Sequence, residues 1–487
     1  MRLFLRKNLI RIHFWIVIVG VVLRVAVYMQ CRCLFIDEAN VARNIYERSF
    51  SGLTLPLSYE QYAPPLFLWI IKSCTLILGY GEYAYRFFPL LCGIAALALM
   101  WRTLKKYAGV YGVCYALTII AFGTIYIRYS CELKQYGCDM VVGLALIMLA
   151  LRSDIFRMKK WQFVMLWGLT GSVSIWLCMP SVFMLAGVGV YYLYLVVRAR
   201  GYWQIPVLSI IGLFWLGQFW LYYLAVLKPQ IQSDYLQNCH KEFFLYSMPV
   251  TVEKLDHDLN VFNKVLSAMG GKWTISICFH LLTFFAGIVW LSKKQFAPLL
   301  LVVVPLCSII VAAMANQYAL TPRLILFAMP LLLIPIAAGV QILFSTKYNS
   351  LKAFWVAVAL ICIINFSGFN LIYHRMENEE LTESLAFVQQ QKITAANVYV
   401  HNLAAPAFIY YTTIHPAHGK WSEIANAHLL NWNSNYDSLG RVLTGLSALV
   451  YSWAPEDEIT SETEKLRQFH KEIMMQKVTG SRVYIYK

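Results

Sequence analysis

Long apolar runs separated by short polar segments fill the chain up to about residue 372. Eleven of these runs approach the length of about 17 to 25 residues that an α-helix needs to cross a membrane. They lie near residues 10–30, 84–104, 110–127, 138–152, 161–178, 182–197, 205–227, 273–291, 297–314, 323–343 and 352–372. The pattern therefore predicts a polytopic α-helical membrane protein, with about eleven transmembrane helices in residues 1–372.

The pattern changes after residue 372. Strand-length apolar runs alternate there with helical or loop-like sequence, which predicts a small α/β domain in residues 373–487; the runs are "NVYVHN", "ALVYSW" and "RVYIYK". Near the end, Ser461 and Glu464 form a capping-box pattern, and apolar residues follow at helical spacing as far as Ile473. Gly480 stands where a helix would stop, so we expect one helix over this stretch.

Composition agrees with a membrane protein. Of the 487 residues, 59% are hydrophobic and only 14% are charged, whereas charged residues make up about 25% of a soluble globular chain. This difference excludes a soluble globular protein. The formal net charge of +16 would suggest a nucleic-acid partner in a soluble chain, but basic residues in a membrane chain first have to be read as topology signals.

Every short loop on one side of the predicted membrane is basic. With the N-terminus on that side, its basic residues are Arg2, Arg6, Lys7, Arg11, Arg102, Lys105, Lys106, Arg152, Arg157, Lys159, Lys160, Arg198, Arg200, Lys293, Lys294, Lys347 and Lys352. Basic loops face the cytoplasm, so segments 31–83, 128–137, 228–272 and 373–487 are predicted to be extracytoplasmic. The charge is thus explained without nucleic acid. Short loops favour a bacterial inner membrane, with an endoplasmic reticulum membrane as the alternative.

Segment 31–83 is too long for a simple connection and carries the first candidate chemistry. Asp37 and Glu38 stand side by side a few residues after the first apolar run, on the predicted outer face. Further on, Pro64 and Pro65 interrupt any continuous helix and favour a new one that starts there. That helix is amphipathic and rich in aromatic residues, which predicts that it lies in the membrane interface with Lys72 near the lipid head groups.

This arrangement resembles a known family. The Asp-Glu pair, followed by "LPLSYEQYAPPLFLWIIK" and "EYAYRFFPLL", is similar to the first extracytoplasmic loop of the C-type glycosyltransferase superfamily. The similarity is to the branch that contains protein O-mannosyltransferases and lipid A aminoarabinose transferases. "CELKQYGCD" at 131–139 and "YALTPRLILFAMPLLLIP" at 318–335 resemble further elements of that branch, and the resemblance covers roughly residues 10–372.

The resemblance implies an inverting transfer of a sugar from a polyprenyl phosphate to an acceptor hydroxyl on the outer face. Such a reaction needs a base for the hydroxyl proton, and we assign that role to Asp37. Glu38 would either orient the acceptor or raise the pKa of Asp37 by like-charge repulsion. We therefore expect the pKa of Asp37 to lie above its ordinary value of about 3.9.

The leaving group of this reaction would be a lipid phosphate, so cations are needed at the membrane face. Lys134, Arg323 and Arg86 fall at outer ends of predicted spans and are the candidates for binding the donor phosphate. The further candidates for substrate binding are Tyr62, Tyr136, Asp139 and Lys72. The sequence has neither a metal-ligand spacing nor an Asp-X-Asp nucleotide-sugar signature beside these residues, so no cofactor is assigned, and a divalent metal ion stays an open alternative.

Other interpretations remain. Asp37 and Glu38 could simply start an interfacial helix, and the three cations could snorkel to lipid head groups. A transporter or flippase is the first competing class, but it would place ionisable residues at mid-membrane. A polymerase or ligase of lipid-linked glycans is the second, but the acidic pair would then be expected in a large late loop. The acceptor, whether glycan, lipid or protein, is left open.

Overall fold

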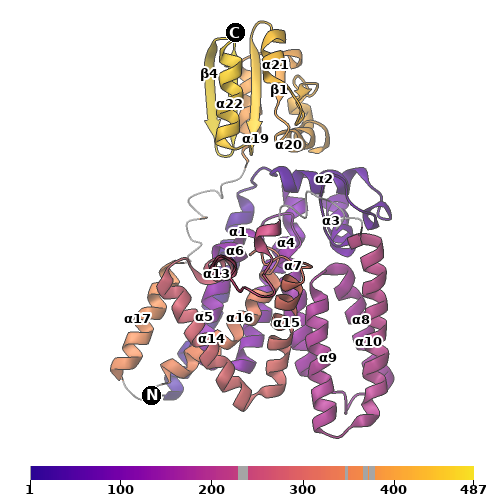
Figure 1. Ribbon diagram of the computed structural model, residues 1–487, viewed down its shortest axis with the longest axis vertical. Coiled ribbons are helices and arrows are strands. Elements are labelled where there is room, and N and C mark those ends of the chain that lie inside the picture. The colour runs from indigo at the N-terminus through magenta and orange to yellow at the C-terminus, as the bar shows by residue number, and fades with distance from the viewer. Residues whose placement is uncertain (1, 229–239, 346–348, 366–370, 372–378) are drawn as a thin grey trace.

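The computed structural model describes residues 2–228, 240–345, 349–365, 371 and 379–487. Figure 1 shows a large helical part and a small part built on a β-sheet, which lies at the end of the helical part near α2 (Ile36–Glu47) and α3 (Pro65–Leu78). The N-terminus lies at the opposite end. The predicted boundary at residues 372 and 373, and residues 229–239 of the predicted loop 228–272, fall outside the described residues.

Each of the eleven predicted apolar runs coincides, over most of its described length, with one helix. The helices are α1 (Arg2–Met29), α4 (Glu82–Tyr107), α5 (Val110–Phe122), α7 (Tyr136–Arg152), α8 (Lys160–Leu177), α9 (Ser181–Arg198), α10 (Ile205–Tyr222), α14 (Thr274–Lys294), α15 (Phe296–Met314), α16 (Met329–Phe344) and α17 (Asn349–Asn365). By length and composition, seven helices in the described part of the chain can cross a membrane. For α5, α7, α8 and α17, which are shorter or less apolar, crossing stays a prediction.

Further elements lie between these helices. They are η1 (Gly52–Thr54), α6 (Thr124–Arg128), η2 (Tyr202–Gln204), η3 (Tyr223–Leu227), η4 (Lys241–Phe243), α13 (Val252–Gly270) and η5 (Leu326–Ala328). As the double proline predicts, α3 begins at Pro65, and Pro64 before it is extended with a ψ of 140°. The predicted helix start is therefore confirmed.

Glycines let the central helices approach closely. A Cβ atom added at Gly339 of α16 would lie 1.9 Å from the carbonyl oxygen of Thr283 in α14, and one at Gly287 of α14 would lie 1.9 Å from that of Pro335. Any larger residue at these positions would have to push the two backbones apart. Small residues at helix crossings are the usual means by which membrane helices pack, because lipid supplies little hydrophobic driving force between them.

The C-terminal part has a five-stranded mixed sheet in the order β2-β1-β3-β5-β4. Its strands are β1 (Val398–Val400), β2 (His428–Leu429), β3 (Ser447–Ser452), β4 (Glu472–Val478) and β5 (Ser481–Tyr486). Its helical elements are α19 (Leu381–Gln390), η6 (Ala395–Asn397), α20 (Ala405–Ile409), η7 (Tyr410–Ile414), η8 (His418–Trp421), α21 (Tyr436–Val442) and α22 (Glu456–Arg467). β1 is parallel to β2 and β3, and β5 is antiparallel to β3 and β4. The three predicted strands correspond to β1, β3 and β5.

The predicted helix near the C-terminus was wrong at both ends. α22 starts at Glu456 after Pro455 and ends at Arg467, whereas Ile473 belongs to β4. Proline and an acidic first turn favour the earlier start. Gly480, with a φ of +69°, lies in the turn that joins β4 to β5. Pairing with β5 therefore overrides the local helical spacing of the β4 residues.

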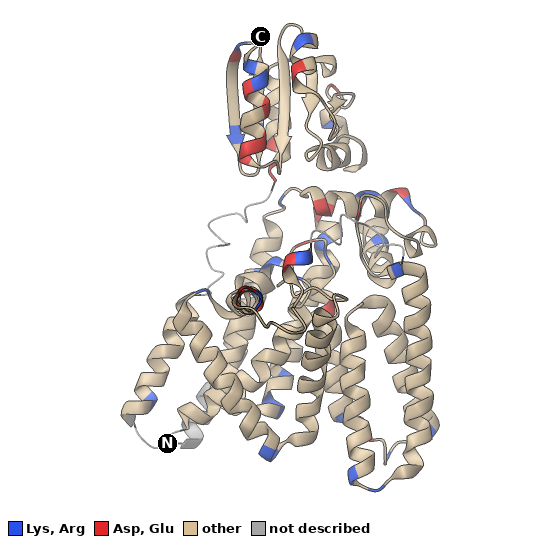
Figure 2. Cartoon of the chain, in the orientation of Figure 1, with Lys and Arg blue, Asp and Glu red and all other residues tan. Residues whose placement is uncertain are grey.

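Basic residues collect at one end of the helical part. Lys105 and Lys106 lie in the last turn of α4, Arg152 in that of α7, and Arg198 in that of α9. Figure 2 shows Lys and Arg at the ends of the helices that lie away from the sheet. This segregation agrees with the pattern on which the predicted topology is based.

Candidate active site

A cavity of about 710 Å³ lies between the helical part and the sheet part. Five separate segments of the helical part contribute to it: α2 with the residue before it, the loop before α3, the turn before α7, His240 before η4, and the segment before η5. The polar residues that these segments bring to the cavity include Asp37, Gln61, Tyr62, Lys134, Tyr136 and Arg323. The volume is within the range of about 300 to 1,000 Å³ that is typical of small-molecule sites.

Asp37 lies in the first turn of α2 and carries the central carboxylate of the cavity. Its Oδ2 atom is 3.5 Å from Nζ of Lys134 and 3.8 Å from Nη1 of Arg323. Gln61 donates to Oδ1 of Asp37 at 3.4 Å and accepts a hydrogen bond from Lys134 at 3.1 Å. One third of the Asp37 side chain is exposed. Three of the predicted site residues, Asp37, Lys134 and Arg323, are therefore neighbours.

The expected rise in the pKa of Asp37 was wrong. Lys134 lowers the pKa of this carboxyl below its ordinary value; burial acts in the opposite direction, and Arg323 adds to the lowering. The repulsion expected from Glu38 is offset, because Glu38 has a cationic partner of its own. Asp37 is consequently ionised at neutral pH.

Glu38 and Arg86 form a buried ion pair that does not line the cavity. Nε and Nη2 of Arg86 donate to the two carboxylate oxygens of Glu38 at 2.9 and 2.5 Å. The backbone N–H of Leu133 donates to Glu38 at 2.6 Å, and Arg86 also donates to the carbonyl oxygens of Arg32 and Cys33. The pair thereby joins α2 and α4 to the turn that carries Lys134. It fixes the position of Lys134 relative to Asp37.

The sheet part contacts α2 through a buried carboxyl group. Glu379 is fully buried, and its Oε2 atom accepts a hydrogen bond from the backbone N–H of Ile36 at 2.9 Å. Phe35, the residue at the N-cap of α2, makes no side-chain cap, so Glu379 supplies the missing acceptor. Burial raises the pKa of the Glu379 carboxyl to about 8. Sequence reasoning missed this residue, since its partner is 343 positions away and no local motif marks it.

Tyr62 and Tyr136 line the cavity as expected of substrate-binding candidates. The hydroxyl of Tyr62 is hydrogen-bonded to that of Tyr222 in α10, and the ring of Tyr136 packs edge-on against Tyr129 at 5.0 Å. Gln61, which sequence reasoning missed, immediately precedes Tyr62 in a segment already singled out by the resemblance. The available signal was a polar side chain within that segment.

Arg86, Asp139 and Lys72 lie outside the cavity lining. Asp139 is buried in α7, and its Oδ1 atom has no hydrogen-bond partner among the described residues. Lys72 is 8% exposed and donates to the carbonyl oxygen of Ile45 at 2.6 Å, so the expectation that it stays near the head groups was wrong. Its ammonium group ties α3 to α2 instead.

One group among the described residues has the composition of a metal site, and it lies in the sheet part. His401 Nε2 is 3.4 Å from Glu458 and 3.7 Å from Glu462. Burial lowers the pKa of His401 to about 4, so the ring is neutral. Nδ1 accepts a hydrogen bond from the N–H of Leu403, which places the ring proton on Nε2, facing the carboxylates. A metal ligand would need a lone pair there, so this arrangement does not fit a metal ion.

We expect Arg86→Met to destabilise the fold strongly, because it leaves the carboxylate of Glu38 buried without its partner. Breaking such a pair costs on the order of 3 to 5 kcal/mol. Thermal unfolding of the purified protein in detergent measures the effect. Arg157→Met is the matched control, since the Arg157 side chain is 89% exposed and its pair with Asp154 should contribute about 0 to 1 kcal/mol. Equal losses in the two variants would contradict the role given to Arg86.

No protein-family profile matches the sequence, and comparison with curated proteins gives no match. Among solved structures, the crystal structure of ArnT from Cupriavidus metallidurans bound to undecaprenyl phosphate matches with a TM-score of 0.52 and 14% identity, over 97% of this chain and 98% of that one. Its apo structure gives the same values. An oligosaccharyltransferase from Archaeoglobus fulgidus matches with a TM-score of 0.49 and 11% identity, over 96% of this chain and 72% of that one.

The likeness to ArnT extends over nearly the whole of both chains, and at 14% identity it concerns the fold. A largely helical part with membrane-spanning helices precedes a small sheet part, as predicted. The predicted fold class, a helical membrane part followed by a small α/β part, is therefore confirmed, and this chain has the fold of ArnT.

Proposed function

We propose that this protein is an inverting glycosyltransferase that moves a sugar from a polyprenyl phosphate to an acceptor hydroxyl at the extracytoplasmic face of the membrane. The observation that carries the proposal is the group formed by Asp37, Lys134 and Arg323 in one cavity, with both cations within 3.8 Å of the carboxylate. The fold supports it, and the ArnT structure that contains undecaprenyl phosphate supports a lipid-linked donor.

Asp37 is the proposed base. Its lowered pKa keeps the carboxylate deprotonated at neutral pH, ready to accept the proton of the attacking hydroxyl. The acceptor oxygen forms a bond to the anomeric carbon while the bond from that carbon to the phosphate oxygen breaks, and the proton passes to Asp37. Attack from the face opposite the phosphate inverts the anomeric configuration. A bound donor phosphate would also interact with Lys134 and Arg323, so these cations would stabilise the Asp37 carboxylate less. The proton affinity of Asp37 would therefore be higher while the donor is bound, which is when Asp37 takes the proton.

Lys134 and Arg323 are proposed to bind the donor phosphate and to stabilise the charge that develops on it. Lys134 is 7% exposed and contacts Asp37 and Gln61, which argues against a lysine that only snorkels to head groups. Tyr62 and Tyr136 are placed to hydrogen-bond the sugar. Arg86 acts through Glu38 as a positioning residue rather than on the phosphate.

A transporter is less well supported. The buried cation of the first span, Arg24, donates to the carbonyl oxygens of Gly20, Ala121 and Ile120 at 2.8 to 3.0 Å. Its hydrogen bonds are therefore used to hold α1 against α5. A transport site at mid-membrane would need such a charge to face a substrate or another ionisable group.

We expect Asp37→Asn to reduce transfer by at least about 10²-fold while the protein stays folded, because asparagine keeps the shape but cannot take the proton. The measurement is release of polyprenyl phosphate from a panel of undecaprenyl-phosphate sugars. Asp154→Asn, in the loop after α7, serves as the control and should retain parental turnover. If Asp37 only favoured the first turn of α2 through its charge, asparagine would cost about 0.3 to 1 kcal/mol of stability and turnover would stay near normal.

Lys134→Gln should weaken donor turnover on the order of 10²-fold, since it removes an electrostatic partner of the leaving phosphate. It should also shift the acidic limb of the pH–rate profile to higher pH, because Lys134 is the main cause of the low pKa of Asp37. Lys105→Gln, in the last turn of α4, is the control. A loss below about threefold with an unshifted profile would favour the snorkelling interpretation.

The proposed orientation predicts that a reporter fused at the C-terminus is active outside the cytoplasm. A reporter fused near residue 156 should be active inside, since the basic loops are expected to stay in the cytoplasm. The two fusions are compared in the same cells. A cytoplasmic signal from the C-terminal fusion would place the cavity on the wrong side for an extracytoplasmic acceptor.

A further inference from the structure

The cavity around Asp37 has two chemically different walls. All its charged side chains come from the helical part, and they include Arg43, Glu60 and the group around Asp37. The sheet part contributes Asn402, Leu403, Ala405, Pro406, Trp432 and Trp453. None of these six residues is charged, so the wall formed by the sheet part is aromatic, aliphatic and amide in character. Lys134 and Arg323, the cations proposed to bind the donor phosphate, lie on the wall formed by the helical part.

Trp453 is the most unusual residue of this neutral wall. It follows β3 with a φ of +59°, a region that a bulky residue with a Cβ atom rarely adopts. Its backbone N–H donates to the carbonyl oxygen of Gly480 at 2.9 Å, which glycine would do equally well without strain. Strain of this kind usually persists where the side chain has a function, and here the indole is 46% exposed.

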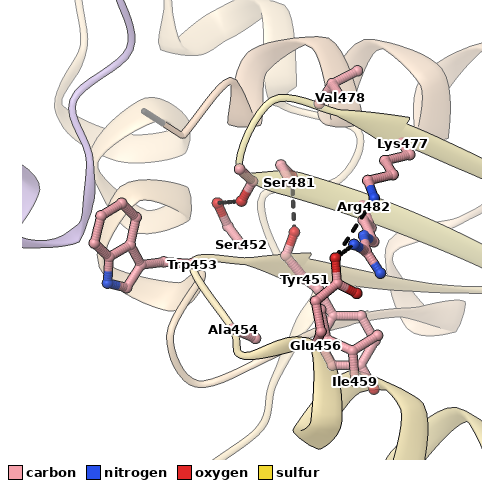
Figure 3. Close-up of a pocket in the computed structure, with 11 residues that line it drawn as sticks. Tyr451, Ser452, Trp453, Ala454, Glu456, Ile459, Lys477, Val478, Ser481 and Arg482 are labelled. Carbon is pink, nitrogen blue, oxygen red and sulfur yellow. Dashed lines mark hydrogen bonds and ion pairs between the residues drawn. The ribbon is translucent and has the colours of Figure 1, made fainter. Parts of the chain in front are cut away.

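The indole of Trp453 is directed at the cavity near Asp37. Figure 3 shows it pointing away from the other labelled residues, on the side of the violet ribbon of the N-terminal part. The ring lies against Phe35, with the centroids 5.6 Å apart and the planes inclined by 36°. Phe35 precedes α2 and is two positions from Asp37. Trp432, 73% exposed, adds a second indole to the same cavity.

We propose that the neutral wall binds the acceptor and that the acceptor is an uncharged saccharide, with Trp453 as the platform for one of its rings. The inference rests on the proposed function and names the acceptor class for that site. The C–H groups on the face of a pyranose carry partial positive charge and suit the negative face of an indole. Asn402 offers an amide to the sugar hydroxyls.

Charge argues against the other acceptor classes. A phosphorylated lipid head group would need cations on this wall, and a charged peptide would need counter-ions, because burying an unpaired charge is costly. The six residues of the wall supply neither. A saccharide ring on Trp453 would instead lie beside Phe35, in the same cavity as the Asp37 carboxylate.

Binding of uncharged disaccharides to the full chain tests the proposal without any donor. The protein is placed in lipid nanodiscs, which carry no sugar head groups, and saturation-transfer NMR is recorded with a panel of uncharged hexose disaccharides. Trp453→Gly removes the ring and accommodates the positive φ, so the variant should fold. Trp453→Phe keeps an aromatic ring. Trp203→Gly is the control, because Trp203 is 84% exposed and lies outside the cavity.

We expect the parent and Trp203→Gly to bind at least one disaccharide of the panel with similar affinity. Trp453→Gly should bind it at least tenfold more weakly, and Trp453→Phe should fall between the two. Equal binding by Trp453→Gly and the parent would overturn the proposal. So would a parent that binds no uncharged disaccharide, or that binds only a phosphorylated saccharide or a serine-containing peptide. Failure of the proposed function is separate, since it would appear as undiminished transfer by Asp37→Asn.

Discussion

A carboxylate buried among apolar residues must have a cationic partner, and the pairing of Glu38 with Arg86 meets that requirement. Successive residues of a helix point about 100° apart, so Glu38 faces the protein while Asp37 beside it faces the cavity. The pair also receives the N–H of Leu133, next to Lys134. One buried interaction thus sets both the direction of the catalytic candidate and the place of its cation.

The sheet part completes this arrangement from the other side. Glu379 accepts a hydrogen bond from the first turn of α2. The hydroxyl of Tyr411 accepts a hydrogen bond from the N–H of Leu34 and donates one to a carboxylate oxygen of Glu82, both at 2.8 Å. These contacts hold the neutral wall of the cavity over Asp37. In our proposals the charged wall serves the lipid-linked donor and the neutral wall the acceptor, so two substrates of different polarity meet at one carboxylate.

The helices and the central group of the site were predictable for physical reasons. Apolar runs of membrane length can form little else than helices, because lipid leaves backbone groups no other partner. The central group could be singled out because each of its members, Asp37, Lys134 and Arg323, lies next to the end of such a run on the predicted outer face of the membrane. The pKa of Asp37 could not be predicted, since it depends on how closely the fold brings Lys134 and Arg323 to its carboxylate. Glu379 and Trp453 escaped for a similar reason: their importance comes from contacts with residues several hundred positions away.

The central claim is that Asp37 faces the reacting carbon while Lys134 and Arg323 hold the leaving phosphate. A structure of the full chain with a non-hydrolysable phosphonate analogue of a polyprenyl-phosphate sugar tests it most directly. The account predicts phosphonate oxygens within about 3 Å of Lys134 and Arg323, the usual range of charge-assisted hydrogen bonds, with the anomeric carbon turned toward Asp37. A phosphonate bound away from both cations, with Asp37 facing no part of the sugar, would contradict it.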